Sequence, residues 1–230
     1  MIAAEEAPAS LGFERPGQTD PDARLIHLFQ RIAQAMAAEK DRLCELDGAI
    51  GDADHGITMV LGFRAVVTSL GRLDPGQATP SQVFGIAGTA FLDAVGASTG
   101  PLYASAFLGA ARALEAFPRF DTAAQLAMLN AIGAGIRQRG KGQRGDKTML
   151  DVWLPAAEAG AAALRGEQEA PAFWASVTEA ATKGAEGTRS MVAARGRAAR
   201  VGQRSLGHLD PGAASAAIII QAMQAEFGTA

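Results

Sequence analysis

Apolar residues recur at intervals of three and four along most of the chain, which is the spacing of an amphipathic helix. The first such segment, 19–47, has one apolar face made of Leu25, Leu28, Phe29, Ile32, Met36 and Leu43. Further helices are predicted over 79–95, 100–117, 121–138, 145–164, 171–188 and 210–227. Alternation with a period of two is absent, and so are Asn-Gly hairpin turns. The pattern therefore predicts an all-α fold.

Capping residues set several of the expected helix boundaries. Thr79, Pro80 and Gln82 form a capping-box sequence with proline in the first turn. Asp210 and Pro211 start the last segment in a similar way, so its Ala-Ile-Ile-Ile run is predicted to be a buried helix and not a strand. Small residues such as those in GASTGPLYASAFLGAA predict close approach of neighbouring helices. Residues 1–19 are polar and contain proline and glycine, which predicts a flexible extension. No linker divides the rest of the chain, which predicts a single domain over 20–230.

Bulk composition narrows the class of protein further. Of the 230 residues, 48% are hydrophobic and 20% are charged, and the net charge is −3. These values are ordinary for a globular domain, and the negative charge gives no case for nucleic acid or an anionic membrane as a partner. The single cysteine, Cys44, cannot form an internal disulfide, and neither a signal peptide nor a membrane-spanning run is present. A cytoplasmic protein is expected.

The stretch LDGAIGDADHGITM, residues 46–59, crowds Asp47, Asp52 and Asp54 together. Asp47 lies four residues after Leu43, on the continuation of the first apolar face, so its carboxylate should point inward. Carboxylates that converge on an interior repel one another and lose hydration unless a cation neutralises them. Oxygen ligands select a hard ion, and because the register of a calcium-binding EF-hand is missing, magnesium shared with a phosphate fits better. The alternative is a solvated acidic turn that caps the next helix.

Three other stretches suit a phosphate-bearing ligand. Residues 95–103 place Ser98 and Thr99 just before a proline-initiated helix, where free N–H groups form either an anion site or an ordinary cap. Residues 139–149 are Gly-rich and basic but lack the spacing of a Walker loop. The run 194–213 is either a phosphate clamp or a solvated basic face. It contains Arg195, Arg197, Arg200, Arg204 and His208.

The remaining chemistry-bearing side chains have more ordinary interpretations. His55 and His208 are each a candidate base or phosphate contact, or they simply hydrogen-bond a turn. Met149, Trp153 and Trp174 have the helical spacing of core residues, although one of them could flank a flat base. Neither a Ser-His-Asp nor a Cys-His arrangement is supported by spacing, and Cys44 is expected to be a buried apolar residue.

Four stretches resemble the signature sequences of a known family, the nucleotide-binding L subunits of dihydroxyacetone kinases. They are LDGAIGDADHGITM, GASTGPLY, RGKGQRGDKTMLDVW and GRAARVGQRSLGHLDPGA. The similarity runs in the family's order and spacing from about residue 22 to the C-terminus. It implies an antiparallel eight-helix barrel that holds ADP or ATP at one end, with the phosphates on two Mg²⁺ ions.

The resemblance also implies which residues form the site. The metal ligands that it implies are Asp47, Asp52 and Asp54. The nucleotide contacts that it implies are His55, Gly56, Ile57, Thr58, Ser98, Thr99, Gly140, Met149, Arg197, Asp210, Pro211 and Gly212. Arg197 is expected to be the catalytic residue that stabilises charge on the transferring phosphoryl group, with Lys147 as a second candidate. Ser98 and Thr99 stand where Ala and Ser are common in the family.

In this family the sugar is held covalently by a histidine of a separate K subunit or domain, so the resemblance implies a chain that is catalytically incomplete alone. A free-standing L chain is typical of systems in which bound ADP is rephosphorylated by a phosphocarrier protein of the phosphotransferase system. ATP as the donor, another small ketose as the substrate, and a non-catalytic nucleotide sensor remain alternatives. Self-association into a homodimer is left open.

Overall fold

Nine α-helices and two 3₁₀ helices make up the part of the chain that the structure describes. The computed structural model describes residues 21–74, 77–117 and 119–229. The elements are α1 (Pro21–Ala38), α2 (Lys40–Gly48), α3 (His55–Leu70), α4 (Pro80–Ala94), α5 (Thr99–Leu114), α6 (Thr122–Gly140), α7 (Leu150–Arg165), α8 (Ala170–Gly187), η1 (Thr188–Ser190), η2 (Ala198–Ser205) and α9 (Pro211–Phe227). None of the described residues forms a β-strand, which agrees with the predicted all-α class. The extension predicted over 1–19 lies outside the described residues.

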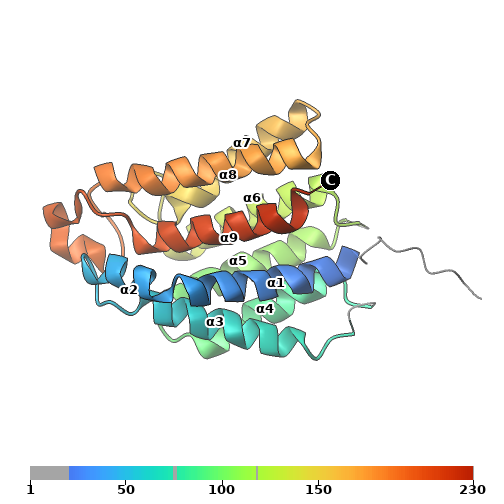
Figure 1. Cartoon of the computed structure of the whole chain (residues 1–230), viewed down its shortest axis with the longest axis horizontal. Coiled ribbons are helices and arrows are strands. Elements are labelled where there is room, and N and C mark those ends of the chain that lie inside the picture. Colours follow the sequence, from blue (N-terminus) through green and yellow to red (C-terminus); the bar gives the residue numbers. More distant parts are fainter. Residues whose placement is uncertain (1–20, 75–76, 118, 230) are drawn as a thin grey trace, which may run out of the picture.

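The long helices lie side by side, with their axes along the length of the molecule (Figure 1). Helices that follow one another in sequence pack together from α3 to α9, and α9 also packs against α1. At the left end in Figure 1 lie α2 and the orange-to-red segment that joins α8 to α9. If α1 and α2 are counted as one helical unit, the described α-helices form eight units. The barrel that the resemblance implies stays a prediction.

The first predicted helix, 19–47, is interrupted. Glu39 has φ −96° and ψ 6°, outside the helical region, so α1 ends before it and α2 begins after it. Nothing in the local sequence marks this break, because Glu39 is a good helix former with neither glycine nor proline beside it. Asp47 nevertheless lies on the buried side of α2 together with Leu43, with 8% of its surface exposed. The inward position predicted for Asp47 is therefore confirmed.

One other boundary differs from the prediction, and one helix had no predicted bounds. The sequence pattern gave no bounds for α3, which was expected only as the helix after the acidic turn. Moreover, α7 begins at Leu150 and not at 145, because the preceding residues form a loop whose Gly145 and Lys147 have positive φ values. The Asp151 carboxylate accepts hydrogen bonds from the N–H groups of Gly145 (2.5 Å) and Thr148 (2.8 Å), which fixes this loop.

The capping predictions agree with the structure. The Gln82 N–H donates to Thr79 Oγ1 (3.2 Å) and the Thr79 N–H donates to Gln82 Oε1 (2.9 Å), which completes the capping box of α4. Asp210 caps α9 by accepting the Ala213 N–H at 2.7 Å. The Ala-Ile-Ile-Ile run is buried inside α9, as predicted.

Aromatic rings fill the middle of the α1, α3, α4 and α5 layer. Ring centroids lie between 5.2 and 6.3 Å apart, mostly in edge-to-face pairs. This geometry adds to the free energy gained by burying each ring. The group consists of Phe29, Phe63, Phe84, Phe91, Tyr103 and Phe107.

Among the described residues, no helix is both long enough and apolar enough to span a membrane.

Gly135→Ala is expected to destabilise the fold because α5 and α6 approach too closely to admit a side chain there. A Cβ at Gly135 would collide with the Ser105 carbonyl oxygen and lie 2.9 Å from the Ala106 Cα. Relief requires movement of one helix, which costs about 1–3 kcal/mol, measured as the free energy of unfolding in urea.

Gly85→Ala in α4 is the matched control for this prediction. A Cβ at Gly85 has no heavy atom within 4 Å, so the substitution should gain up to about 1 kcal/mol of helix propensity. Equal effects of the two substitutions would contradict the close approach of α5 and α6.

Candidate functional site

A cavity of about 440 Å³ opens at the end of the molecule where α2 meets α3. We call it the end cavity. Its wall includes residues at the N-terminal ends of four helices: His55 of α3, Thr99 of α5, Leu150 of α7 and Pro211 of α9. Backbone N–H groups and the positive end of the helix dipole face a ligand at such positions. Four helix starts around one cavity favour an anionic ligand.

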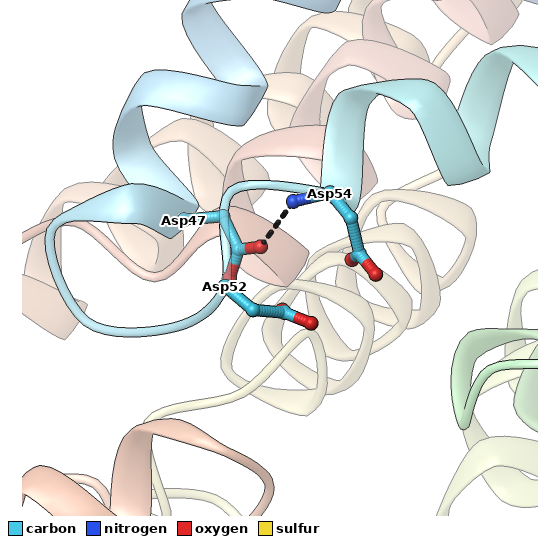
Figure 2. A group of neighbouring side chains, drawn as sticks. All are labelled: Asp47, Asp52 and Asp54. Carbon is cyan, nitrogen blue, oxygen red and sulfur yellow. Dashed lines mark hydrogen bonds between the residues drawn. The ribbon is translucent and has the colours of Figure 1, made fainter.

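The three aspartates predicted to bind metal meet at the wall of this cavity. Figure 2 shows them converging from the end of α2, the following loop and the residue before α3. Each offers a carboxylate oxygen, and these oxygens lie within 4.8 Å of one another. The set is Asp47, Asp52 and Asp54. Three carboxylate oxygens at this separation fit a hard divalent cation such as Mg²⁺.

Local backbone structure holds the acidic cluster together. Asp47 Oδ2 accepts hydrogen bonds from the N–H groups of Asp54 (3.0 Å) and His55 (3.3 Å). Ala53 has φ 65°, a left-handed conformation that is uncommon for alanine and lies between the two loop aspartates. A Cβ at Gly51 would collide with the Asp47 carboxylate. Gly51 thus leaves the room that the Asp47 carboxylate occupies, and the left-handed turn at Ala53 lies between the other two aspartates.

The electrostatics of the cluster favour a positively charged partner. Burial raises the pKa of Asp54, and the nearby charge of Asp47 raises it further. The guanidinium of Arg197 forms ion pairs with Asp52 and, at 3.3 Å, with Asp54. Arg197 therefore crosses from the segment between α8 and α9 to the acidic loop, where it lies in the wall of the cavity.

The arginines of the basic run 194–213 fall into two groups, one for each interpretation proposed from the sequence. Arg195 and Arg197 line the cavity, as a clamp would. Arg200 and Arg204 are exposed and lie outside the cavity wall, as on a solvated face.

His55 and Asp210 lie in the wall and are both buried. His55 Nε2 is 2.9 Å from Ser215 Oγ, which fixes the start of α3 against α9. Burial lowers the pKa of His55 to about 4, although the charge of Asp47 opposes the shift. Burial also raises the pKa of Asp210 to about 7, a shift that the Ala213 N–H opposes. Asp151 and Asp47 act in the same direction as burial, and Lys147 acts against it.

The free energy of unfolding of the ligand-free chain is expected to fall as the pH rises from about 4 to about 7, in part because of Asp210. Its pKa is raised from the ordinary value of 3.8 to about 7, so the folded state binds the proton more tightly than the unfolded state does. Ionisation then costs at most about 4 kcal/mol of stability. Asp210→Asn keeps an oxygen that can accept the Ala213 N–H, and it should flatten this part of the profile in urea unfolding.

Asp121→Asn makes the same exchange at the cap of α6, where Asp121 accepts the Ala124 N–H at 3.0 Å. It is the matched control and should follow the wild-type profile. Parallel profiles for all three chains would show that Asp210 is not the group responsible.

Most of the residues assigned by resemblance lie around the end cavity. Three do not line it: Gly56, Ile57 and Thr58. Gly56 packs against α2, where a Cβ would collide with the Lys40 carbonyl oxygen, and Ile57 is 51% exposed. The assigned residues in the wall are Asp47, Asp52, Asp54, His55, Ser98, Thr99, Gly140, Met149, Arg197, Asp210, Pro211 and Gly212.

Several wall residues were not assigned from the sequence. Arg139 ends α6 beside Gly140, and Thr148 lies in the loop before α7. The only signal for Thr148 was its spacing of three from Asp151, a capping pattern. Nothing in the sequence distinguished the apolar residues of the cavity wall from ordinary core residues. They include Ala97, Pro101, Leu102, Ile136 and Leu150.

Fold and site together define a class: an all-α domain with an acidic cluster that could hold a metal ion, beside a cavity suited to anions. The model of one family, the DAK2 domain, matches residues 49–225. The protein belongs to the DAK2 domain family.

Curated relatives match over most of their length. The PEP-dependent dihydroxyacetone kinase 1, ADP-binding subunit DhaL, of Listeria innocua is 39% identical over 192 residues, which cover 84% of this chain and 90% of that protein. The PTS-dependent dihydroxyacetone kinase, ADP-binding subunit DhaL, of Lactococcus lactis is 33% identical over 198 residues, covering 86% of this chain and 94% of that protein.

Among solved structures, the dihydroxyacetone kinase from C. freundii in complex with AMP-PNP and Mg²⁺ matches with a TM-score of 0.65 and 22% identity. The match covers 97% of this chain but 36% of that kinase. The likeness shows a shared fold, and this chain spans little more than a third of the larger protein.

Proposed function

We propose that this chain is the ADP- and Mg²⁺-binding subunit of a dihydroxyacetone kinase and takes part in phosphoryl transfer to dihydroxyacetone. One observation carries the proposal: three converging carboxylates and Arg197 meet in the wall of a cavity lined by four helix starts. The names of the relatives from Listeria innocua and Lactococcus lactis support the choice of nucleotide and substrate.

Asp47, Asp52 and Asp54 would hold the metal, for which two Mg²⁺ ions are expected. Magnesium held by these carboxylates would supply positive charge that offsets the charge of the phosphate groups during transfer. The Asp47 carboxylate already accepts two backbone hydrogen bonds through Oδ2. Its inward, fixed position makes it the anchor of the set, with the more exposed Asp52 and Asp54 able to adjust to the ligand.

The nucleotide would lie along the cavity wall, with its phosphates toward the acidic cluster. Ser98 and Thr99 at the start of α5 would present N–H and hydroxyl groups to it. The remaining proposed contacts are His55, Gly140, Met149, Asp210, Pro211 and Gly212, with Gly56, Ile57 and Thr58 carried by resemblance alone. Arg197 is the proposed catalytic residue, because its guanidinium lies beside the cluster and can donate to the transferring oxygens.

A separate K subunit would supply the sugar, held covalently on a histidine, so the chain is proposed to be inactive alone. Large exposed apolar side chains support a docking surface beside the acidic cluster: Ile57 and Leu61 follow it on α3 with 51% and 50% exposure. The phosphoryl donor is proposed to be a phosphocarrier protein of the phosphotransferase system acting on bound ADP in the cytoplasm. The PTS-dependent relative supports this route over free ATP.

Leu61→Ser is expected to weaken binding of the K subunit about tenfold or more, because removal of an exposed apolar anchor at an interface costs on the order of 1–2 kcal/mol. Surface plasmon resonance against an immobilised K subunit measures the change. Thr68→Ala, on the same helix but near its far end, is the control. Equal affinities of the two variants would place the interface elsewhere.

Native mass spectrometry followed by an activity assay tests the function as a whole. The purified chain should retain ADP with magnesium, and adding a dihydroxyacetone-binding K subunit and a phosphoryl donor should yield phosphorylated sugar. Retained nucleotide without transfer would favour a nucleotide sensor. Transfer to a different ketose alone would correct the substrate.

A further inference from the structure

Residues 189–207, which we call the strap, run from within η1 to a few residues before α9 and carry Arg197 to the acidic cluster. The strap has few long-range ties of its own. Ser205 Oγ accepts the Ala193 N–H at 2.9 Å, and the Arg189 carbonyl accepts the Gly207 N–H at 2.8 Å. Gly202 has φ 56° and interrupts η2. Its position relative to the cavity therefore depends on contacts with other segments, among them the ion pairs of Arg197 with Asp52 and Asp54.

Lys147, in the loop before α7, contacts the chain at both ends of the strap. Its Nζ donates hydrogen bonds to the carbonyl oxygens of Thr188 and His208, the residues on either side of the strap. Lys147 is 1% exposed. Its φ of 60° is left-handed, a conformation that costs free energy for a residue with a side chain. A buried ammonium group that donates to two carbonyl oxygens makes strong charge-assisted hydrogen bonds.

The residues around Lys147 extend the same tie. Thr188 Oγ1 accepts the Asp210 N–H at 3.0 Å, which joins the segments on either side of the strap directly. The Asp146 carbonyl accepts the Ala194 N–H at 3.1 Å, and Asp146 Oδ2 accepts Arg195 Nε–H at 3.3 Å. The loop 145–147 thus holds the strap at its ends and near Arg197.

We propose that Lys147 is a positioning residue that closes the strap at its two ends and so holds Arg197 against the acidic cluster. The contrasting role is a direct phosphate contact, as expected from the resemblance. Two of the three ammonium donors already have carbonyl partners, which favours positioning. The consequence for catalysis rests on the proposed function; the consequence for the strap does not.

Limited trypsin digestion of the nucleotide-free chain tests the tie. The strap contains Arg189, Arg195, Arg197, Arg200 and Arg204 as cleavage sites. In Lys147→Met, cleavage within the strap should be at least about tenfold faster than in the wild type, since local opening sets the cleavage rate. The helices should still melt cooperatively. Lys147→Arg keeps donors for the two carbonyls and should restore part of the protection.

Lys183→Met is the matched control, because it removes one trypsin site from an exposed lysine of α8 that pairs with Glu179. It should digest like the wild type. Unchanged cleavage of the strap in Lys147→Met would overturn the proposal. Loss of cooperative melting in that variant would also overturn it, because the tie is confined to the strap, and so would a Lys147→Arg chain as labile as Lys147→Met.

Kinetics with the K subunit separates positioning from direct contact. Positioning predicts that Lys147→Met lowers kcat at least about tenfold with less than about a threefold change in the KM for nucleotide, and adds little to Arg197→Ala. A direct contact predicts weaker nucleotide binding and additive effects, which would contradict the proposal. Since the digest needs neither nucleotide nor partner, its result is independent of whether the proposed kinase function holds.

Discussion

Asp52→Asn should abolish retention of nucleotide and magnesium while leaving the helical fold intact. Asp52 lies in the loop between α2 and α3 and offers one of the three clustered oxygens. The substitution removes a negative charge from the set that would hold the metal, and a phosphate cannot stay near the remaining carboxylates without that metal. Native mass spectrometry after gel filtration measures what is retained, and circular dichroism measures the helix content.

Asp41→Asn supplies the control for the metal assignment. Asp41 is exposed on α2 and pairs only with its neighbour Lys40 among the described residues, so nucleotide retention should be unaffected. A stoichiometric nucleotide on Asp52→Asn would show that the acidic cluster is not the metal site.

Arg197→Ala should keep the bound nucleotide but lower kcat with the K subunit. Its guanidinium contacts both loop carboxylates of the cluster, so it lies where negative charge would develop during transfer. Loss of one such donor costs at least ~2 kcal/mol of transition-state stabilisation, or roughly a thirtyfold loss of rate.

Arg200→Ala removes an exposed arginine from the same strap, one that does not line the cavity. Its kcat should match that of the wild type. If Arg197→Ala were as active as Arg200→Ala, the catalytic role would belong to another residue of the end cavity, with Arg139 and Arg195 as the candidates.

The helical elements could be predicted largely from local sequence. Apolar spacing and caps identified the helices at 79–95 and 210–227 because Thr79 and Asp210 satisfy the first N–H groups of their helices through local hydrogen bonds. The break at Glu39 could not be predicted, because no local residue signals it: Glu39 is a good helix former with neither glycine nor proline beside it. The late start of α7 was missed because Asp151 folds back on the loop before it.

The acidic part of the site was equally visible in sequence. Crowded carboxylates are unstable without a counter-charge, so their spacing predicted a cation. The inward position of Asp47 was predicted from its place four residues after Leu43, and Asp47 is buried. The role of Lys147 was not visible. A lysine in a Gly-rich basic loop reads as a phosphate ligand, and only the distant carbonyls of Thr188 and His208 show where its ammonium goes.

The sequence by itself determined which segments are helical and which short stretches are candidates for a ligand site, because caps, apolar periodicity and charge crowding act between residues that are neighbours in the chain. The tertiary structure decided that four helix starts share one cavity, that Arg197 reaches Asp54 from 143 residues away, and that Lys147 is buried. These features depend on how the helices pack, and packing joins side chains whose separation along the chain leaves no local signal.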